Sequence, residues 1–470
     1  MSEARILYDT VIKNNYCIGC GACALIKGSP FEIEMDKYGQ LVANSNVDSL
    51  SNCSTQSLLE VCPFSGKSKN ENELSDLFFP EVNKSNDKIG KYISCFVGYA
   101  KEDEFRKKGS SGGIAKWIGY QLLKLGKIDY FVQIQSNSTN DSDALLFDYK
   151  LFDNYNDILL GSKSAYYPTT LVNILKEIEN KPGRYAITGV PCNIKALRLL
   201  SLNNEVLKEK IKYTIGIVCG GMKSANYTKL VGWELGVHPN NLVKIDFRRK
   251  YENRPANEKI YQVWSSNPNQ DSIYKDVSQI YGTGYASGFF KPNACDYCDD
   301  VLAETADIAI GDAWLKKYVN DPKGTSVIVV RDSELNDILL KANEEQKIHI
   351  EEISAEDVAF AQKGGLRHRR EALSRRIAKK EKAGEWVPPK RVKANQFKIG
   401  RKRKQIYDLR ERIAKKSHVA FSKALEKNKL SYFHRKMNPF VLWFVIINFT
   451  ELLPKLPRRL FLFIYNKFFK

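Results

Sequence analysis

The chain has 470 residues, enough for two or three domains and a substantial core, and its 43% hydrophobic content is typical of a globular protein. Its ten cysteines and a polar N-terminus without a long apolar signal segment argue against a disulfide scaffold. We therefore expect reduced thiols and metal ligation in the cytoplasm.

The positive charge lies in the C-terminal segment. Residues 363–470 contain 31 Lys and Arg against 7 Asp and Glu, whereas residues 1–362 contain 42 against 47. The net charge of +19 therefore describes the C-terminal segment, and the rest of the chain is mildly acidic.

The first motif is a C-x2-C-x2-C run followed by a distant Cys-Pro pair. Such a run occupies three corners of one cubane, its small residues let the backbone approach the inorganic sulfides, and the Cys-Pro supplies the fourth corner. We expect a ferredoxin-like 4Fe-4S domain over residues 1–75, with these ligands: Cys17, Cys20, Cys23 and Cys62.

Two alternatives stay open for this motif. Cys53 competes with Cys62 as the fourth ligand, although the proline after Cys62 turns the chain away from the cluster. A zinc knuckle could use the same run, but no histidine lies nearby and the Gly-Ala spacing favours iron and sulfur. The polar residues 67–90 that follow indicate a linker or a surface-exposed connection.

From residue 92 onward, strand and helix patterns alternate to about residue 350, which predicts an α/β (α+β) body over residues 90–360. Expected strands cover 92–99, 128–135, 184–188, 211–218 and 307–312, and expected helices cover 114–125 and 193–200. Cys95 lies in the first strand and is expected to be a core residue.

A second set of four cysteines lies in this body. Cys192 and Cys219 each follow an expected strand, and Cys295 and Cys298 form a C-x-x-C pair. Thiolates from three separate segments suit a metal or iron–sulfur centre, and a helix N-terminus after Cys192 favours its thiolate form. Alternatively, they are unrelated buried thiols, and the C-x-x-C alone also fits zinc or a redox dithiol.

Two loops could hold an anionic cofactor. Ser110, Ser111, Gly112 and Gly113 open a helix, where N–H groups and the helix dipole favour phosphate, although an ordinary turn has the same composition. The loop 161–168 could hold a flavin ribityl chain or a phosphate, or could simply cap a helix beginning at Pro168. Its candidate residues are Lys163, Ser164 and Tyr166.

Further cations stand at 248–250, where they could meet an anionic ligand or form a solvated strand end. Residues 363–436 are basic with helical spacing, and the apolar runs 440–447 and 460–465 are too short to span a bilayer. This basic helical tail, 363–470, suits an interfacial anchor on an anionic inner leaflet. A docking surface for a partner protein and helices packed on the body are the alternatives; nucleic acid is not expected.

With these motifs together, the chain resembles the family of beta subunits of coenzyme F420 hydrogenases and dehydrogenases over roughly residues 15–335. The motifs that carry the resemblance are both cysteine sets, the Ser-Ser-Gly-Gly loop, Thr188-Gly-Val-Pro-Cys192, Cys219-Gly-Gly and the segment from Cys295 to Asp312. The resemblance implies an iron–sulfur flavoprotein with two 4Fe-4S clusters and FAD. It places Thr188, Gly189 and the Ser164 loop near the flavin.

The expected function is that of an oxidoreductase. Electrons would pass between a redox partner, either ferredoxin-like or a dehydrogenase or hydrogenase subunit, the clusters and FAD, to reduce or oxidise coenzyme F420 or another organic substrate. The long tail departs from the hydrogenase subunits and leaves the substrate open, with polysaccharide biosynthesis as one setting. No catalytic residue is assigned; Asp312, Lys163 and Tyr166 are only candidates for a general acid.

Two other functions remain. The chain could be a non-enzymatic electron-transfer or scaffold subunit docked on a membrane or partner through its basic tail. It could also be a zinc-binding structural protein. In each case the expected location is cytoplasmic, with the tail suggesting a peripheral position at the inner membrane face.

Overall fold

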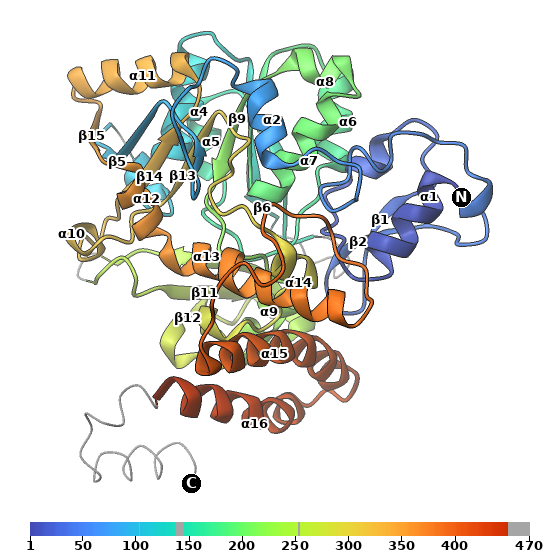
Figure 1. Cartoon of the computed structure of the whole chain (residues 1–470). Helices are drawn as coiled ribbons and strands as arrows, with labels where there is room; N and C mark the ends of the chain where they lie inside the picture. The colour runs from blue at the N-terminus through green and yellow to red at the C-terminus, as the bar shows by residue number, and fades with distance from the viewer. Residues whose placement is uncertain (103, 138–144, 252–253, 450–470) are drawn as a thin grey trace.

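The computed structural model describes residues 1–102, 104–137, 145–251 and 254–449. Its centre is an eight-stranded mixed sheet with the strand order β15-β5-β14-β13-β9-β8-β6-β7 (Figure 1). In that order, the strands are Ile348–Glu352, Ser94–Ala100, Ser326–Val330, Ile308–Asp312, Ile211–Ile217, Tyr185–Gly189, Tyr130–Ser136 and Phe147–Phe152. The expected α/β body is therefore confirmed.

Strand direction brings several loops to one edge of this sheet. β6, β8, β9 and β13 are mutually parallel, and β5 shares their direction because β14 runs antiparallel to both β13 and β5. Open α/β sheets bind ligands outside the carboxyl ends of such strands. The loops after these five strands are thus the place to look for a site.

Helices cover both faces of the sheet. α4 (Ile114–Lys124) and α11 (Ser333–Glu344) share a core with the residues on one face, including Phe96 of β5. α7 (Pro191–Ser201) packs on the other face, and α6 (Val172–Asn180) and α8 (Glu205–Lys210) lie beside it in the same core. Cys95, next to Phe96, points into a core on the opposite face, as expected for alternating strand residues and for a core thiol.

Most expected elements agree with the structure to within about two residues, but two expectations are wrong. The 67–90 linker contains α2 (Glu71–Phe78), which begins with a capping box formed by Asn70 and Glu73 and buries Leu74. The helix expected from Pro168 begins only at Val172, so neither Ser164 nor Tyr166 caps it.

Smaller elements complete the body. The N-terminal segment starts with α1 (Glu3–Leu7) and carries the antiparallel hairpin β1 (Glu32–Met35) and β2 (Leu41–Asn44). α9 (Ala225–Glu234) shares an apolar core with the three-stranded sheet β10-β11-β12, whose strands are Leu242–Arg249, Ile260–Ser265 and Ile273–Asp276. The remaining elements are β3 (Ser85–Asn86), β4 (Gly90–Lys91), α3 (Phe105–Lys108), α5 (Tyr155–Leu160), α10 (Lys316–Val319), α12 (Ala355–Ala361) and several single-turn helices.

The basic segment folds against the body as α13 (Lys363–Arg367), α14 (Leu373–Lys382), α15 (Arg401–Glu426) and α16 (Leu430–Phe449). α15 and α16 lie side by side below β12 and α9 (Figure 1). The two helices share an apolar core with α9 and the three-stranded sheet, and Phe421 of α15 and Phe433 of α16 are fully buried in that core. Of the alternatives left open by the sequence, packing on the body therefore describes this part of the chain.

Only one of the two apolar runs of the tail lies among the described residues. Residues 440–447 belong to α16, whereas 460–465 lie outside the described residues. Among the helices that the structure describes, none is both long and apolar enough to cross a membrane.

Candidate functional site

The first cysteine set lines one cavity. All four expected ligands line it: Cys17, Cys20, Cys23 and Cys62. The apolar and aromatic side chains of Tyr16, Ile18, Ile33 and Phe64 complete the lining. Cys53, the rival fourth ligand, does not line this cavity, and its Sγ lies 3.4 Å from Thr55 Oγ1. The geometry therefore favours Cys62.

Two glycines let the chain turn around this cavity. Gly19 and Gly21 have φ angles of +66° and +88°, a left-handed conformation that residues with a side chain rarely adopt. A Cβ on Gly19 would lie 2.4 Å from the Leu41 carbonyl oxygen, so β2 passes directly over the turn. The small residues that the sequence singled out are thus required for both backbone conformation and close approach.

The second set lines a neighbouring cavity. Cys192 stands at the start of α7 after β8, Cys219 follows β9, and Cys295 and Cys298 lie in and just after the 3₁₀ helix η7 (Asn293–Tyr297). The cavity is completed by Ile18, Phe64, Pro191, Met222, Asp300 and Arg369. The sheet edge and the loop at 295–298 therefore bring together the four sulfurs that the sequence grouped.

The two cavities share a wall, since Ile18 and Phe64 line both. Burial raises the pKa of Cys192 well above its ordinary value, and the sulfurs of Cys298, Cys219, Cys295 and even Cys20 of the first set add to the rise. Burial and the neighbouring sulfurs therefore oppose the thiolate form that the helix N-terminus would favour in Cys192.

Burial acts in the same direction on two further thiols: it raises the pKa of Cys62 and of Cys295 to about 12. A positive charge nearby favours the thiolate form, and an iron centre held between the sulfurs would supply such a charge. In the described part of the chain, no three His, Cys, Asp or Glu residues are grouped so as to hold a single metal ion.

Two cations from the C-terminal segment approach the sulfurs. Arg369 is 2% exposed and donates to the carbonyl oxygens of Cys219, at 3.0 Å, and Cys295, at 3.4 Å. Lys390 lies 4.4 Å above the centre of the Phe64 ring in the shared wall. Its charge lowers the pKa of both Cys62 and Cys298, although burial, the larger effect, raises them.

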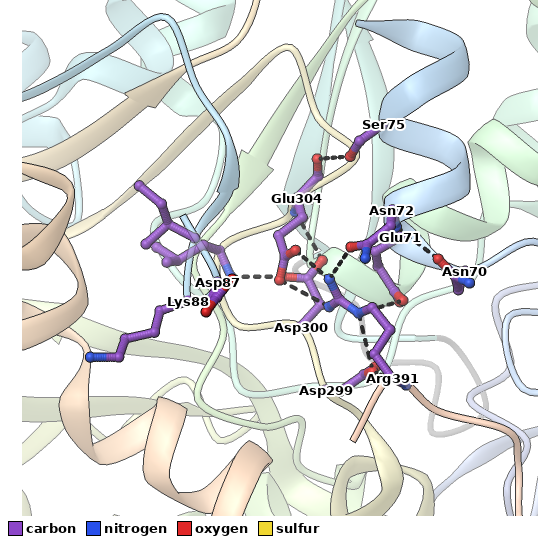
Figure 2. Close-up of polar contacts among 12 residues, drawn as sticks. Asn70, Glu71, Asn72, Ser75, Asp87, Lys88, Asp299, Asp300, Glu304 and Arg391 are labelled. Carbon is purple, nitrogen blue, oxygen red and sulfur yellow. Dashed lines mark hydrogen bonds and ion pairs between the residues drawn. The ribbon is translucent and has the colours of Figure 1, made fainter. Parts of the chain in front are cut away.

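Arg391 fixes the acidic loop that follows Cys298. Figure 2 shows its guanidinium among the carboxylates of Glu71, Asp299 and Glu304. Its Nη2 lies 3.0 Å from Glu304, and Lys195 of α7 pairs with Glu71 at 3.0 Å. The loop, α2, α7 and the C-terminal segment are thereby joined by buried ion pairs next to the second cavity.

The two loops expected at a flavin lie against each other. The Ser110 hydroxyl oxygen accepts hydrogen bonds from the Ser164 backbone N–H, at 2.7 Å, and from its hydroxyl, at 3.0 Å. Gly112 donates its N–H to Ser326 Oγ at 3.1 Å, and Gly113, the N-cap residue just before α4, has a φ of +83°. Within the described structure no side chain caps α4, so its first N–H groups are available to an anion.

Cations outnumber carboxylates around these loops. Lys163 pairs with Asp246 at 3.0 Å, and the buried Arg248 pairs with Asp312 at 2.8 Å. Lys250 donates to the Ser111 carbonyl oxygen at 2.8 Å, and burial, with the charges of Lys163 and Arg106, lowers its pKa to about 7. Residues 248 and 250 are thus turned inward, which corrects the interpretation as a solvated strand end, and the surroundings suit an anionic cofactor.

Two tyrosines connect these loops to the second cavity. Lys259 Nζ lies 3.2 Å from the Tyr166 hydroxyl; burial raises the pKa of Tyr166, but Arg248 and Lys259 outweigh it and hold it below its ordinary value. The Tyr285 ring lies 6.0 Å from that of Tyr166, and its hydroxyl donates to the Gly221 carbonyl oxygen at 2.7 Å. Gly221 follows Cys219, so only a few side chains separate the two regions.

Thr188 and Gly189 end β8 at the same sheet edge. The Thr188 hydroxyl is buried and donates to the Val132 carbonyl oxygen at 3.1 Å. A Cβ on Gly189 would lie 2.9 Å from the side chain of Ile194. The structure therefore gives Thr188 a bond within the sheet and places both residues just before the Cys192 turn.

Several residues at the site escaped prediction: Ile18, Phe64, Met222, Tyr285, Arg369, Lys390 and Arg391. The apolar and tyrosine residues carry no sequence signal of their own. The three cations stand in a long basic run, where composition could not separate buried from exposed charges.

The structure is that of an α/β protein with a cysteine-lined cavity beside the carboxyl edge of its mixed sheet, where Cys192 and Cys219 follow two of the strands. Family models for the coenzyme F420 hydrogenase/dehydrogenase beta subunit match residues 95–176 (N-term) and 183–356 (C terminus), together more than half of the chain. The chain therefore belongs to the family of coenzyme F420 hydrogenase/dehydrogenase beta subunits, as the motifs predicted.

Individual relatives are distant. The coenzyme F420-dependent sulfite reductase of Methanocaldococcus jannaschii is 23% identical over 359 residues, covering 73% of this chain and 49% of that protein. A subunit of the F(420)H(2) dehydrogenase of Methanosarcina mazei is 24% identical over 251 residues, covering 51% and 64%. The chain thus spans about half and about two thirds of their lengths. A chain of the F420-reducing [NiFe] hydrogenase complex from Methanosarcina barkeri superposes with a TM-score of 0.49 and 18% identity, covering 65% of this chain and 99% of that one.

Proposed function

We propose that the protein is an iron–sulfur flavoprotein oxidoreductase. It passes electrons between a ferredoxin-type partner, two 4Fe-4S clusters and FAD, and so reduces or oxidises an organic substrate. The observation that carries the proposal is the wall of Ile18 and Phe64 shared by the two cysteine-lined cavities. Clusters held on either side of one layer of side chains would be direct neighbours, as an electron relay requires.

Each cavity offers four cysteine sulfurs in largely apolar surroundings, which fits a thiolate-bound cluster. Cys17, Cys20, Cys23 and Cys62 would hold the first cluster, within a ferredoxin-like domain over residues 1–75, and Cys192, Cys219, Cys295 and Cys298 the second. The redox partner would meet the first set, which lies in the N-terminal domain; burial is similar in the two sets, since Cys17 and Cys62 of the first and Cys192 and Cys298 of the second are all partly buried.

The paired loops at Ser110–Gly113 and Lys163–Tyr166 would hold FAD, which when bound exchanges single electrons for hydride transfer. The inward-facing cations and the uncapped start of α4 support this assignment, because they would neutralise the pyrophosphate. Tyr166 and Tyr285 would fill the space between the cofactor and the second cysteine set. Thr188 and Gly189 would shape the sheet edge beside it.

The names of the relatives favour coenzyme F420 as the substrate. Another organic substrate, for example in polysaccharide biosynthesis, is the alternative. The redox partner is then a ferredoxin-like protein or a dehydrogenase or hydrogenase subunit, and the setting is the cytoplasm.

A second candidate is a non-enzymatic electron-transfer or scaffold subunit. The name of the Methanosarcina mazei relative, which describes one subunit of a dehydrogenase, favours it. Such a subunit would dock on its partner, or peripherally on an anionic membrane, through the C-terminal segment, whose α16 exposes Trp443 and Ile446.

Anaerobic purification with iron, sulfide and flavin analysis tests these proposals. The oxidoreductase should carry about eight irons and one FAD, since each cubane holds four irons. Clusters without flavin would favour the second candidate, and a colourless preparation after iron–sulfide reconstitution would end both. Oxidation of reduced F420, NADH and reduced ferredoxin then identifies the electron donor.

A further inference from the structure

We infer that Arg369 is the cation that stabilises the second cluster and raises its reduction potential. This inference rests on the proposed function, because it requires a cluster in the second cavity. It concerns a residue of the basic segment, beyond residue 356, where the family match ends.

Contacts hold the Arg369 guanidinium against the second set. Its Nη2 donates to the Cys219 carbonyl oxygen at 3.0 Å and lies 3.9 Å from the Cys219 sulfur. Its Nη1 donates to the Cys295 carbonyl oxygen at 3.4 Å. Two bonds to the chain segments that carry ligands leave the group little freedom to turn away, so its charge faces the cavity.

Arg369 has no carboxylate among the described ion pairs, unlike its neighbours in the same segment. Arg376 pairs with Asp296 at 2.8 Å, and Arg391 meets Glu71, Asp299 and Glu304. The Nε of Arg369 also has no hydrogen-bond partner in the described structure. A buried arginine without an anion is costly, and a thiolate-bound cluster is the anion that would balance it.

The one carboxylate among the described residues that line the same cavity is engaged elsewhere. Asp300 accepts hydrogen bonds from the backbone N–H groups of Leu302, at 2.8 Å, and Glu304, at 2.9 Å. None of the described ion pairs joins Asp300 to Arg369, so Arg369 has no paired carboxylate within the cavity.

The direction of the effect follows from charge. Reduction adds one negative charge to a cluster that four thiolates already make anionic, so a fixed cation stabilises the reduced form more than the oxidised form. Among the described residues, no arginine lines the cavity of the first set, and the half-buried Lys390 at Phe64 is the cation that approaches it. Arg369 thus separates the potentials of two otherwise similar centres.

EPR-monitored redox titration of anaerobically purified full-length protein tests the inference. The variants are Arg369→Gln, Arg369→Lys and, as matched control, Arg367→Gln, an exposed arginine two residues away. A Cys62→Ala variant, which removes a ligand of the first cluster, assigns the signals. We expect Arg369→Gln to shift the second cluster to lower potential and the first much less, whereas Arg369→Lys and Arg367→Gln stay near the wild type.

Loss of the second cluster in Arg369→Gln but not in Arg369→Lys would also support a requirement for charge. An unchanged second potential in Arg369→Gln, an equal shift in Arg367→Gln, or loss of the cluster in both Arg369 variants would overturn the inference. These outcomes leave the wild-type clusters in place, whereas failure of the proposed function would show as wild-type protein without clusters or flavin.

Discussion

The two cysteine sets differ in how the chain builds them. Three sulfurs of the first set come from the seven residues 17–23, and their cavity depends on two left-handed glycines and the β2 strand above them. The second set combines two strand ends with the loop at 295–298, and Arg369 from the C-terminal segment lines its cavity. One centre is a local motif and the other is a product of the whole fold, so they should respond differently to damage.

The largest expected effect separates the two centres directly. Cys295→Ala removes a ligand of the second set and should lower the iron content from about eight to about four per chain, leaving the first cluster intact. Cys20→Ala should do the converse. Iron analysis with EPR of the reduced protein measures both.

Cys95→Ala and Cys53→Ala are the controls, because Cys95 lies in a core and Cys53 lines neither cavity. Both should keep the full iron content. Loss of iron in Cys53→Ala, with Cys62→Ala unaffected, would reverse our choice of the fourth ligand.

The next largest effect tests how strongly the second set depends on the surrounding fold. Arg391→Gln leaves Glu71, Asp299 and Glu304 without their shared cation in a buried site. Breaking a buried ion pair in this way typically costs about 3–5 kcal/mol, so the free energy of unfolding should fall by about that amount. Denaturant titration of the apoprotein measures it.

Lys393→Gln is the matched control, an exposed lysine in the same segment that should change stability by less than about 0.5 kcal/mol. In holoprotein, Arg391→Gln should also release iron from the second cluster before the first. Equal loss from both clusters would contradict the contrast between a local and an assembled centre.

The same contrast explains what the sequence could predict. The first set was readable because ligand spacing, small residues and Cys-Pro all lie within the first 63 residues. The second set could be grouped only through strand ends and the C-x-x-C, and its neighbours could not be found. Arg369 stands between exposed and half-buried arginines, at 367 and 370, so only helix orientation makes it different. Tertiary packing determines that orientation, and the charge composition of the segment does not indicate which arginine is buried.

The secondary structure is likewise only partly predictable from the sequence. Strands and helices with strong apolar patterns were placed correctly, since periodicity reflects burial on one or both faces. The helix α2 was missed because its residues are mostly polar: it is held by a capping box and by Glu71, which pairs with Lys195 and Arg391. A charged segment whose ion-pair partners lie far along the chain has the same local composition as a linker, so its helix is not predicted from the local sequence.

The smallest expected effect concerns the far end of the C-terminal segment. Arg369 of this segment is buried near the second set, but on α16 the apolar side chains of Trp443 and Ile446 are 53% and 45% exposed, in a segment rich in Lys and Arg. If they insert into an anionic bilayer, the double variant Trp443→Gln/Ile446→Gln should bind anionic vesicles at least tenfold more weakly. Full burial of each side chain contributes about 1.5–3 kcal/mol, about half of each is still exposed, and about 1.4 kcal/mol corresponds to a factor of ten. Vesicle sedimentation measures the partition.

Leu340→Gln on α11, 42% exposed and outside the C-terminal segment, is the matched control and should not change vesicle binding. Equal sedimentation of all three proteins would leave packing on the body, with Arg369 at the second cysteine set, as the role of the segment.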